Sequence, residues 1–143
     1  MAKSVATCNS LLKLLFNATA WSGIADNAAS APYTNLYLSL HTADPGTGNS
    51  QTTNETTYTN YARVAVVRTN VGWTVATNTA VNAALAQFPQ CGATGATLTY
   101  VAIGTNSTGA GNVLYSGALT SSLAVSSGIQ PQFSASALTV TET

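Results

Sequence analysis

The chain has 143 residues, of which only 6% are charged, and its four Lys or Arg residues balance its four Asp or Glu residues. So few cations cannot neutralise a run of phosphates, which excludes DNA, RNA and anionic membrane surfaces as electrostatic partners. With 45% apolar residues and no net charge the chain is expected to fold, and its length predicts a single domain over residues 1–143.

The first predicted element is a helix over about residues 4–16. Apolar residues recur there at three- and four-residue spacing, and Ser4 is placed to cap the start. Lys13 interrupts the apolar run, which argues against a secretory signal. No segment reaches the roughly 18 apolar residues that a membrane-spanning helix needs.

The next predicted element is a strand over residues 33–41, where apolar and polar residues alternate strictly. This period places Leu36, Leu38 and Leu40 on one face and polar residues on the other. Residues 42–60 open with an Asp-Pro-Gly turn and continue without any period. They predict a long polar loop, and loops of this length are usually functional or mobile.

A second strand is predicted over residues 61–69, followed by a turn into a third. Further strands are expected at residues 73–75, 83–88, 97–103 and 113–119, and in two pieces within 129–141, separated by loops rich in Gly, Ser, Thr and Asn at 89–95, 104–111 and 120–128.

The pattern as a whole predicts a mainly β fold. About seven or eight short strands with a single helix are typical of a two-sheet β-sandwich or jelly roll, here with the N-terminal helix packed on or beside it. Thr, Ser and Asn make up about a third of the chain and replace the usual surface Lys and Glu. A surface without charge repulsion is expected to be partly covered by other protein.

The only histidine, His41, lies near Ser39 and Asp44, so the residue types of a hydrolytic triad are present. Three residues on one strand and its turn do not easily form the nucleophile, base and orienting group, which usually come from separate elements. We therefore expect His41 at a strand end and Asp44 closing the turn. The remaining carboxylates are scattered, so the chain is predicted not to be an enzyme.

No cofactor or metal site is predicted either. Cys8 and Cys91 have no metal-binding spacing and are expected to be two separate thiols. The glycine-rich residues 104–111 lack the Lys of a phosphate-binding loop and lie between strands, which favours a flexible hairpin loop.

Arg63 and Arg68 lie in or at the end of an apolar strand and therefore need assigned partners. An internal carboxylate or carbonyl cluster is one possibility, and a contact to another subunit is the other. The aromatic residues could form a sugar-binding platform, although core packing is commoner for residues on strands; they are Trp21, Tyr33, Tyr37, Tyr58, Tyr61, Trp73 and Tyr115.

Residues 36–46 (LYLSLHTADPG), the polar loop after them, and residues 61–66 (YARVAV) with Arg68 resemble a group of small tailed-phage structural proteins. The resemblance continues through Phe88-Pro89, the glycine-rich loop, residues 114–117 (LYSG) and residues 128–133 (GIQPQF), so it covers roughly positions 33–135. Members of this group are described as capsid decoration or tail-fibre-like proteins. The size and β-rich pattern also resemble the capsid cement protein of the Bordetella phage type, a jelly roll that dimerises on the capsid exterior.

The resemblance implies a non-enzymatic virion protein on the outer capsid surface. It would bind the major capsid protein lattice and stabilise it, as a homodimer or other homo-oligomer, through many modest contacts. The expected contact residues are Leu11, Leu12, Leu15 and Phe16 on the helix, the strand with Arg63 and Arg68, and exposed strand edges. The alternative is a tail-fibre-like or receptor-binding module that recognises a host surface glycan.

Overall fold

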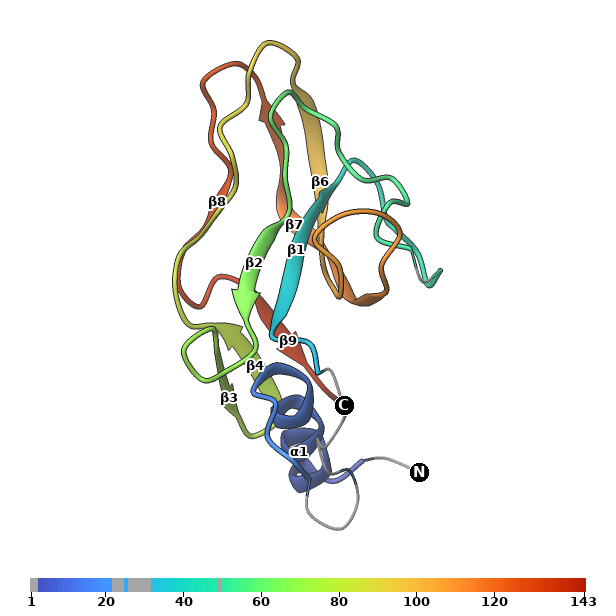
Figure 1. Ribbon diagram of the computed structural model, residues 1–143, viewed down its shortest axis with the longest axis vertical. Coiled ribbons are helices and arrows are strands. Elements are labelled where there is room, and N and C mark those ends of the chain that lie inside the picture. Colours follow the sequence, from blue (N-terminus) through green and yellow to red (C-terminus); the bar gives the residue numbers. More distant parts are fainter. Residues whose placement is uncertain (1–2, 22–24, 26–31, 49) are drawn as a thin grey trace. The chain divides into compact units, whose positions relative to one another are not determined.

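The computed structural model describes residues 3–21, 25, 32–48 and 50–143, and within them it contains one α-helix, α1 (Val5–Phe16). The strands are β1 (Asn35–His41), β2 (Val64–Val67), β3 (Trp73–Ala76), β4 (Thr79–Asn82), β5 (Ala86–Gln87), β6 (Ala96–Gly104), β7 (Val113–Val125), β8 (Gln132–Phe133) and β9 (Thr139–Thr141) (Figure 1). The mainly β class with one N-terminal helix is confirmed.

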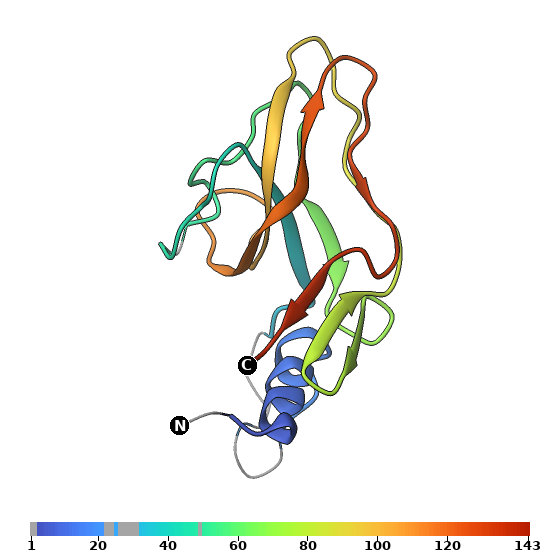
Figure 2. The same ribbon diagram turned by 180° about the vertical axis from the view of Figure 1, so that it is seen from behind.

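The strands form three sheets, compatible with a β-sandwich. The largest has the order β2-β1-β6-β7, the second has the order β3-β4-β9, and β5 pairs with β8. The pairs β1–β6, β6–β7, β3–β4 and β4–β9 are antiparallel. Figure 2 shows β6 and β7 side by side.

The chain divides into two compact units that are interleaved in sequence. Unit 1 comprises Met1–Asn35, Val66–Ala86 and Phe133–Thr143, and unit 2 comprises Leu36–Ala65 and Gln87–Gln132. Unit 1 holds the helix and the β3-β4-β9 sheet, whereas unit 2 holds most of the four-stranded sheet. That the whole chain is one domain stays a prediction.

In unit 1, the helix forms where the sequence predicts it and packs on β3 and β4. The Ser4 hydroxyl accepts a hydrogen bond from the Thr7 backbone N–H at 3.2 Å, which satisfies a donor of the first helical turn. Cys8, Leu12 and Phe16 recur every four residues and are buried. Phe16 meets the Trp73 ring edge to face at 4.6 Å between centroids, an arrangement that aromatic pairs favour.

In unit 2, strand β1 is buried on both faces along its C-terminal half. The predicted face of Leu36, Leu38 and Leu40 is confirmed as core. Ser39 and His41 on the opposite face are also buried, although alternation predicted an open polar face. The predicted polar loop explains the difference, because it also contributes buried residues, namely Gln51, Thr56 and Tyr58.

Three strand predictions need correction. Of the strand predicted over residues 61–69, only β2 forms, and of the strand predicted over 83–88, only the two-residue β5 forms. Strand β4, which lies before residue 83, was not predicted. Strand β7 continues to Val125, through residues 120–125 of the predicted loop. Residues 119–122 there bulge opposite Thr99, between the pairs Leu98↔Leu123 and Tyr100↔Ala118, and a bulge accommodates extra residues without ending a strand.

Candidate functional site

The apolar stripe of α1 faces the sheet of its own unit. Leu12 and Phe16 are 0% exposed, so their side chains are core residues and have no surface to offer a partner in this structure. Leu11 and Leu15 are half-buried. Of the four helix residues expected to contact a partner, only these two retain accessible surface.

Arg63 lies inside unit 2, with a side chain that is 3% exposed. Its Nε donates to Glu55 Oε1 at 2.6 Å and its Nη2 donates to Glu55 Oε2 at 2.7 Å, which is bidentate pairing. Nη1 and Nη2 also donate to the carbonyl oxygens of Asn106 and Gly109, each at 2.8 Å. Four of the five N–H groups that a guanidinium carries are thus bound internally.

The Glu55 carboxylate joins this pair to strand β1. Tyr61 donates its hydroxyl to Glu55 Oε1 at 2.8 Å, and the same hydroxyl oxygen accepts the Leu40 backbone N–H at 3.1 Å. The hydrogen bond with Glu55 is the main cause that raises the pKa of Arg63, and burial raises the pKa of Tyr61 above its ordinary value. Both groups therefore keep their protons at neutral pH.

Arg68 belongs to unit 1 and caps the C-terminal end of α1. Its guanidinium donates to the carbonyl oxygens of Leu14 and Leu15, and to that of Tyr33 at 3.1 Å. The last carbonyls of a helix lack partners within it, and a cation there complements the helix dipole. Burial lowers the pKa of Arg68.

The two arginines are therefore not brought together into one surface. One occupies a carboxylate and carbonyl cluster in unit 2, and the other occupies a carbonyl cluster in unit 1. Of the two partner types that the sequence left open, the structure shows the internal type for both. A contact of Arg63 or Arg68 with another subunit stays a prediction.

Ser39 and His41 form the hydrogen-bonded pair that the sequence raised as a possible catalytic dyad. His41 Nδ1 lies 2.9 Å from the Thr53 carbonyl oxygen, which can only accept, so Nδ1 carries the proton and Nε2 accepts from the Ser39 hydroxyl at 2.9 Å. Burial lowers the pKa of His41, against the opposing effect of the Thr53 carbonyl. Both side chains belong to residues that are 0% exposed, so no substrate reaches this hydroxyl.

Asp44 has the turn role that the sequence predicted. Its Oδ1 accepts the Gly46 backbone N–H at 2.8 Å, and Gly46 has a φ of +72°, a conformation that glycine adopts without strain. The Asp-Pro-Gly motif therefore makes a turn and does not orient His41.

The glycine-rich loop packs around Gln51, a residue of the polar loop 42–60 that the sequence did not single out. Gln51 is fully buried, and its Oε1 accepts the Asn106 backbone N–H at 2.9 Å, while its own backbone N–H donates to Ala110. A Cβ added at Gly104 or Gly111 would overlap the Gln51 side chain. These two glycines make room for the Gln51 side chain, which therefore packs against the inner side of the glycine-rich loop.

The aromatic residues do not gather into an exposed platform within the described part of the chain. Tyr58 and Trp73 are buried, and Tyr61 stacks on Phe88 with 6.4 Å between ring centroids. Tyr33 is exposed. Core packing, the other role considered for these residues, accounts for Tyr58 and Trp73, whereas Trp21, Tyr37, Tyr61 and Tyr115 are half-buried.

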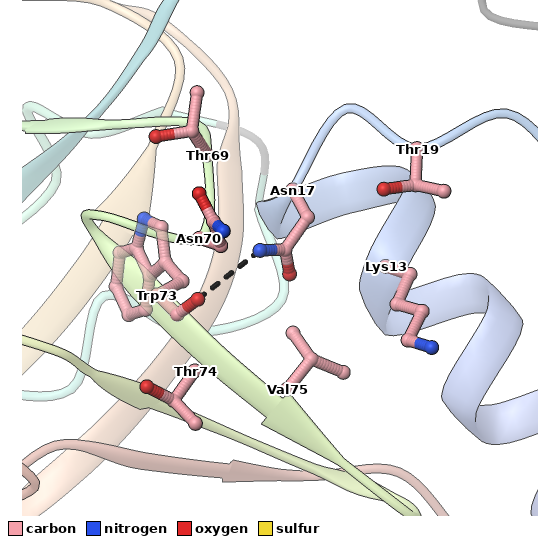
Figure 3. Close-up of a pocket in the computed structure, with 8 residues that line it drawn as sticks. All are labelled: Lys13, Asn17, Thr19, Thr69, Asn70, Trp73, Thr74 and Val75. Atoms are coloured by element: carbon pink, nitrogen blue, oxygen red, sulfur yellow. Dashed lines mark hydrogen bonds between the residues drawn. The ribbon is translucent and has the colours of Figure 1, made fainter.

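A pocket of about 660 Å³ lies in unit 1 beside the C-terminal end of α1 (Figure 3). The Asn17 Nδ2 donates to the Trp73 carbonyl oxygen at 3.1 Å, which fixes the orientation of the amide. Asn17 Oδ1 and Trp73 Nε1 have no hydrogen-bond partner, but both atoms are buried, so a molecule in the pocket does not reach them. The lining residues are Lys13, Asn17, Thr19, Thr69, Asn70, Trp73, Thr74 and Val75.

Cys8 and Cys91 are free and buried, as two separate thiols. Among the residues whose placement is described, no three His, Cys, Asp or Glu side chains cluster as metal ligands would. Within the same residues, no helix has both the length and the apolar character needed to span a bilayer.

Comparison with known families decides the class of this protein. The sequence matches, over residues 2–141, the family described as podophage GP4 fiber I protein gp80. The chain belongs to this family. It is therefore a bacteriophage structural protein and a part of the virion, as the resemblance of residues 33–135 implied. No curated protein matches the chain.

Proposed function

We propose that this chain is a fibre component of a podophage virion and that it acts through protein contacts, without catalysis. The observation that carries the proposal is the family match, which extends over residues 2–141 to proteins described as fiber I. A match of this extent includes both compact units. The fibre alternative is thereby favoured over capsid decoration.

The distribution of charge supports a role in lasting protein contact. No Asp, Glu, Lys, Arg or His occurs between Arg68 and Glu142, so half of the chain presents only neutral side chains. Arg63 and Glu55 neutralise each other inside unit 2. Neutral polar surfaces bind by shape and hydrogen bonding, and repetition in an assembly makes many such modest contacts durable.

The buried Ser39–His41 pair supports the non-enzymatic part of the proposal. Its geometry matches that of a nucleophile and its base, but both residues are sealed from solvent. The pair instead connects β1 to the polar loop through the hydrogen bond from His41 Nδ1 to the Thr53 carbonyl oxygen. A structural role therefore accounts for its hydrogen bonds.

Capsid decoration is the second candidate, because the size and β-rich pattern of the chain resemble a capsid cement protein and the group that residues 36–46 and 61–66 resemble includes capsid decoration proteins as well as tail-fibre-like ones. In this role the chain would bind the major capsid protein on the outer surface of the shell. The most regular part of the motif is internal, however, because Leu36, Leu38 and Leu40 are buried and Arg63 binds Glu55 within unit 2. These residues therefore stabilise the fold of unit 2 and do not by themselves distinguish capsid decoration from a fibre role.

The position of the protein in the virion separates the two candidates. Virions carrying an epitope tag after Thr143 would be labelled with gold and imaged, and the copy number would be measured by quantitative mass spectrometry. We expect label at the tail and a low copy number. Label over the whole shell, at a copy number that matches the capsid lattice, would overturn the fibre proposal.

A binding assay addresses the receptor role within the fibre proposal. Purified protein would be mixed separately with virions lacking it and with host surface polysaccharide. Rebinding to the tails of the deficient virions supports a structural component of the fibre. Binding to polysaccharide alone would instead make it a receptor-binding module, and rebinding to capsids would support decoration.

A further inference from the structure

His41 lies in a site that suits only its neutral form. Its Nδ1–H donates to the Thr53 carbonyl oxygen and its Nε2 accepts the Ser39 hydroxyl, each at 2.9 Å. A protonated imidazole has a donor on both nitrogens, so the Ser39 hydroxyl would have to turn and accept. The hydroxyl proton would then lose its acceptor, because Nε2 is its one partner among the described residues and both residues are 0% exposed.

The charges around His41 leave no spare negative charge for a second cation. Glu55 favours a positive charge at His41 and Arg63 opposes one, and the two neutralise each other in their bidentate pair. The other titratable neighbours are Tyr61 and Tyr100, from the end of the polar loop and from β6, and a tyrosine adds no negative charge in acid. Protonation would therefore place a net positive charge in a cluster that is largely sealed from water, which is costly.

Residues 50–54 of the polar loop cover this histidine, and none of their side chains is apolar. The segment is attached to β1 by hydrogen bonds from His41 to Thr53 and from the Thr42 backbone N–H to the Asn54 carbonyl oxygen at 2.9 Å. Its one buried side chain, Gln51, accepts the Asn106 backbone N–H, but Gln51 Nε2 is buried without a partner. The closed segment thus has an unpaired polar group that water would satisfy if the segment moved.

The chain is fixed on both sides of this segment. Before it, β1 ends at His41 and Asp44 closes the turn that follows. After it, Glu55 is held by Arg63, and the Thr56 backbone N–H donates to the Leu40 carbonyl oxygen at 2.9 Å. Residues 50–54 can therefore leave β1 while the chain on either side keeps its contacts, and local opening of this kind is a property of weakly packed segments.

We propose that residues 50–54 form an acid-sensitive cover, which is closed on β1 when His41 is neutral and opens when His41 takes up a proton. Opening brings water to the imidazole and to the Gln51 amide, and it leaves the Arg63–Glu55 pair in place. In acid the protein then presents a different surface to its neighbours, with the Thr42 backbone N–H free to bind. The inference goes beyond the proposed function and holds for a fibre and for a capsid protein alike.

The size of the effect follows from the uptake of one proton. In the open form the imidazole titrates near its ordinary pKa of about 6.5, whereas burial lowers the pKa of His41 in the closed form. The closed form is therefore favoured above pH 6.5. Between the two pKa values, each unit by which the pH falls raises the ratio of open to closed protein by up to about tenfold.

Amide hydrogen exchange of the purified, ¹⁵N-labelled full chain, followed by NMR from about pH 8 to about pH 5, tests the proposal. After correction for the intrinsic effect of pH on exchange, the amides of Thr42, Gln51 and Asn106 should lose protection by up to about tenfold per pH unit below 6.5. The Thr56 amide and the amides of β6 should keep theirs. Because His41 is the only histidine, its ring signals report the same site and should titrate together with the opening.

Two variants isolate the histidine. His41→Gln cannot take up the proton, so its three reporter amides should stay protected throughout the pH range. Adding Thr97→His to this variant returns one histidine to an exposed position on β6 of the same unit. This matched control should also stay closed in acid. Far-UV circular dichroism checks the fold of each variant, and the unmodified protein decides the question if His41→Gln does not fold.

Three results would overturn the proposal. The first is a His41 ring that becomes protonated while the Thr42 and Gln51 amides keep their protection, or amides whose protection does not depend on pH. The second is an acid response that persists in a folded His41→Gln variant. The third is a loss of protection at Thr56 and in β6 in parallel with Thr42, which would mean that acid unfolds unit 2 as a whole. None of these results depends on where the virion carries the chain.

Discussion

Replacing Arg63 with methionine should destabilise unit 2 strongly. The side chain is 3% exposed and makes four hydrogen bonds, two to Glu55 and two to loop carbonyls. Methionine fills much of the same space but leaves the Glu55 carboxylate, which is 13% exposed, without its cation. The two carbonyl oxygens in the glycine-rich loop also lose their donor.

The expected loss follows from the burial of the pair. Removing one member of a buried ion pair typically costs about 3–5 kcal/mol, and the partial exposure of Glu55 places this case near the lower end. At about 2–4 °C per kcal/mol for a chain of this size, the Tm should fall by on the order of 10 °C. The free energy of unfolding would be measured by urea titration with circular dichroism.

Two further variants test the physical cause. Glu55→Gln in the Arg63→Met background removes the unpaired charge, keeps an acceptor for the Tyr61 hydroxyl, and should recover part of the loss. Lys3→Met removes a cation from the exposed pair with Glu142 and should leave the midpoint unchanged. If Arg63→Met is as stable as Lys3→Met, Arg63 is not an internal anchor and becomes available to a partner.

Three other properties should follow from the buried groups. Burial lowers the pKa of His41 below 6.5. The contribution of His41 to stability is therefore complete above pH 6.5 and is lost as the pH falls through the lowered pKa. Urea midpoints measured across this pH range should decline as the pH falls, and His41→Gln should make the decline smaller. Gly104→Ala should lower the free energy of unfolding by about 1–3 kcal/mol, because the new methyl group overlaps Gln51. Adding Gln51→Ala should recover part of this stability in thermal melts. No recovery would mean that another contact is responsible. Cys8 and Cys91 are buried thiols and should react with Ellman's reagent only after denaturation; fast reaction of the native protein would contradict their burial.

The elements that sequence predicts best are those whose signal is local. The period of three and four residues and the Ser4 cap indicate α1, and strict alternation indicates the core face of β1. Both signals arise within one element, because the buried side of a helix or strand fixes which positions are apolar. The end of β7 was missed because its Thr120-Ser121-Ser122 sequence resembles a loop, and β4 was missed because its four residues are too few to show a clear period.

The buried polar contacts could not be predicted, because they depend on long-range packing. Four carboxylates were possible partners for Arg63, and only the path of the loop brings Glu55 to it. Gln51 lies in a polar segment and has no feature that distinguishes it from its exposed neighbours. The requirement for space at Gly104 was the one available signal, and glycine in a loop has commoner explanations.

The scarcity of charge acquires a more specific meaning from these contacts. Lys3 pairs with Glu142, Arg63 pairs with Glu55, and Arg68 binds carbonyl oxygens at the end of α1. Three of the four cations thus serve the chain's own structure, and the fourth, Lys13, is exposed beside the pocket, so most groups available for recognition are hydroxyls, amides and backbone groups. Such groups gain specificity from geometry, because a hydrogen bond requires a donor and an acceptor at the right distance and angle. A virion protein with this surface is therefore expected to bind its neighbours through shape and hydrogen bonding, which depend much less than exposed ion pairs on the ionic strength of the medium.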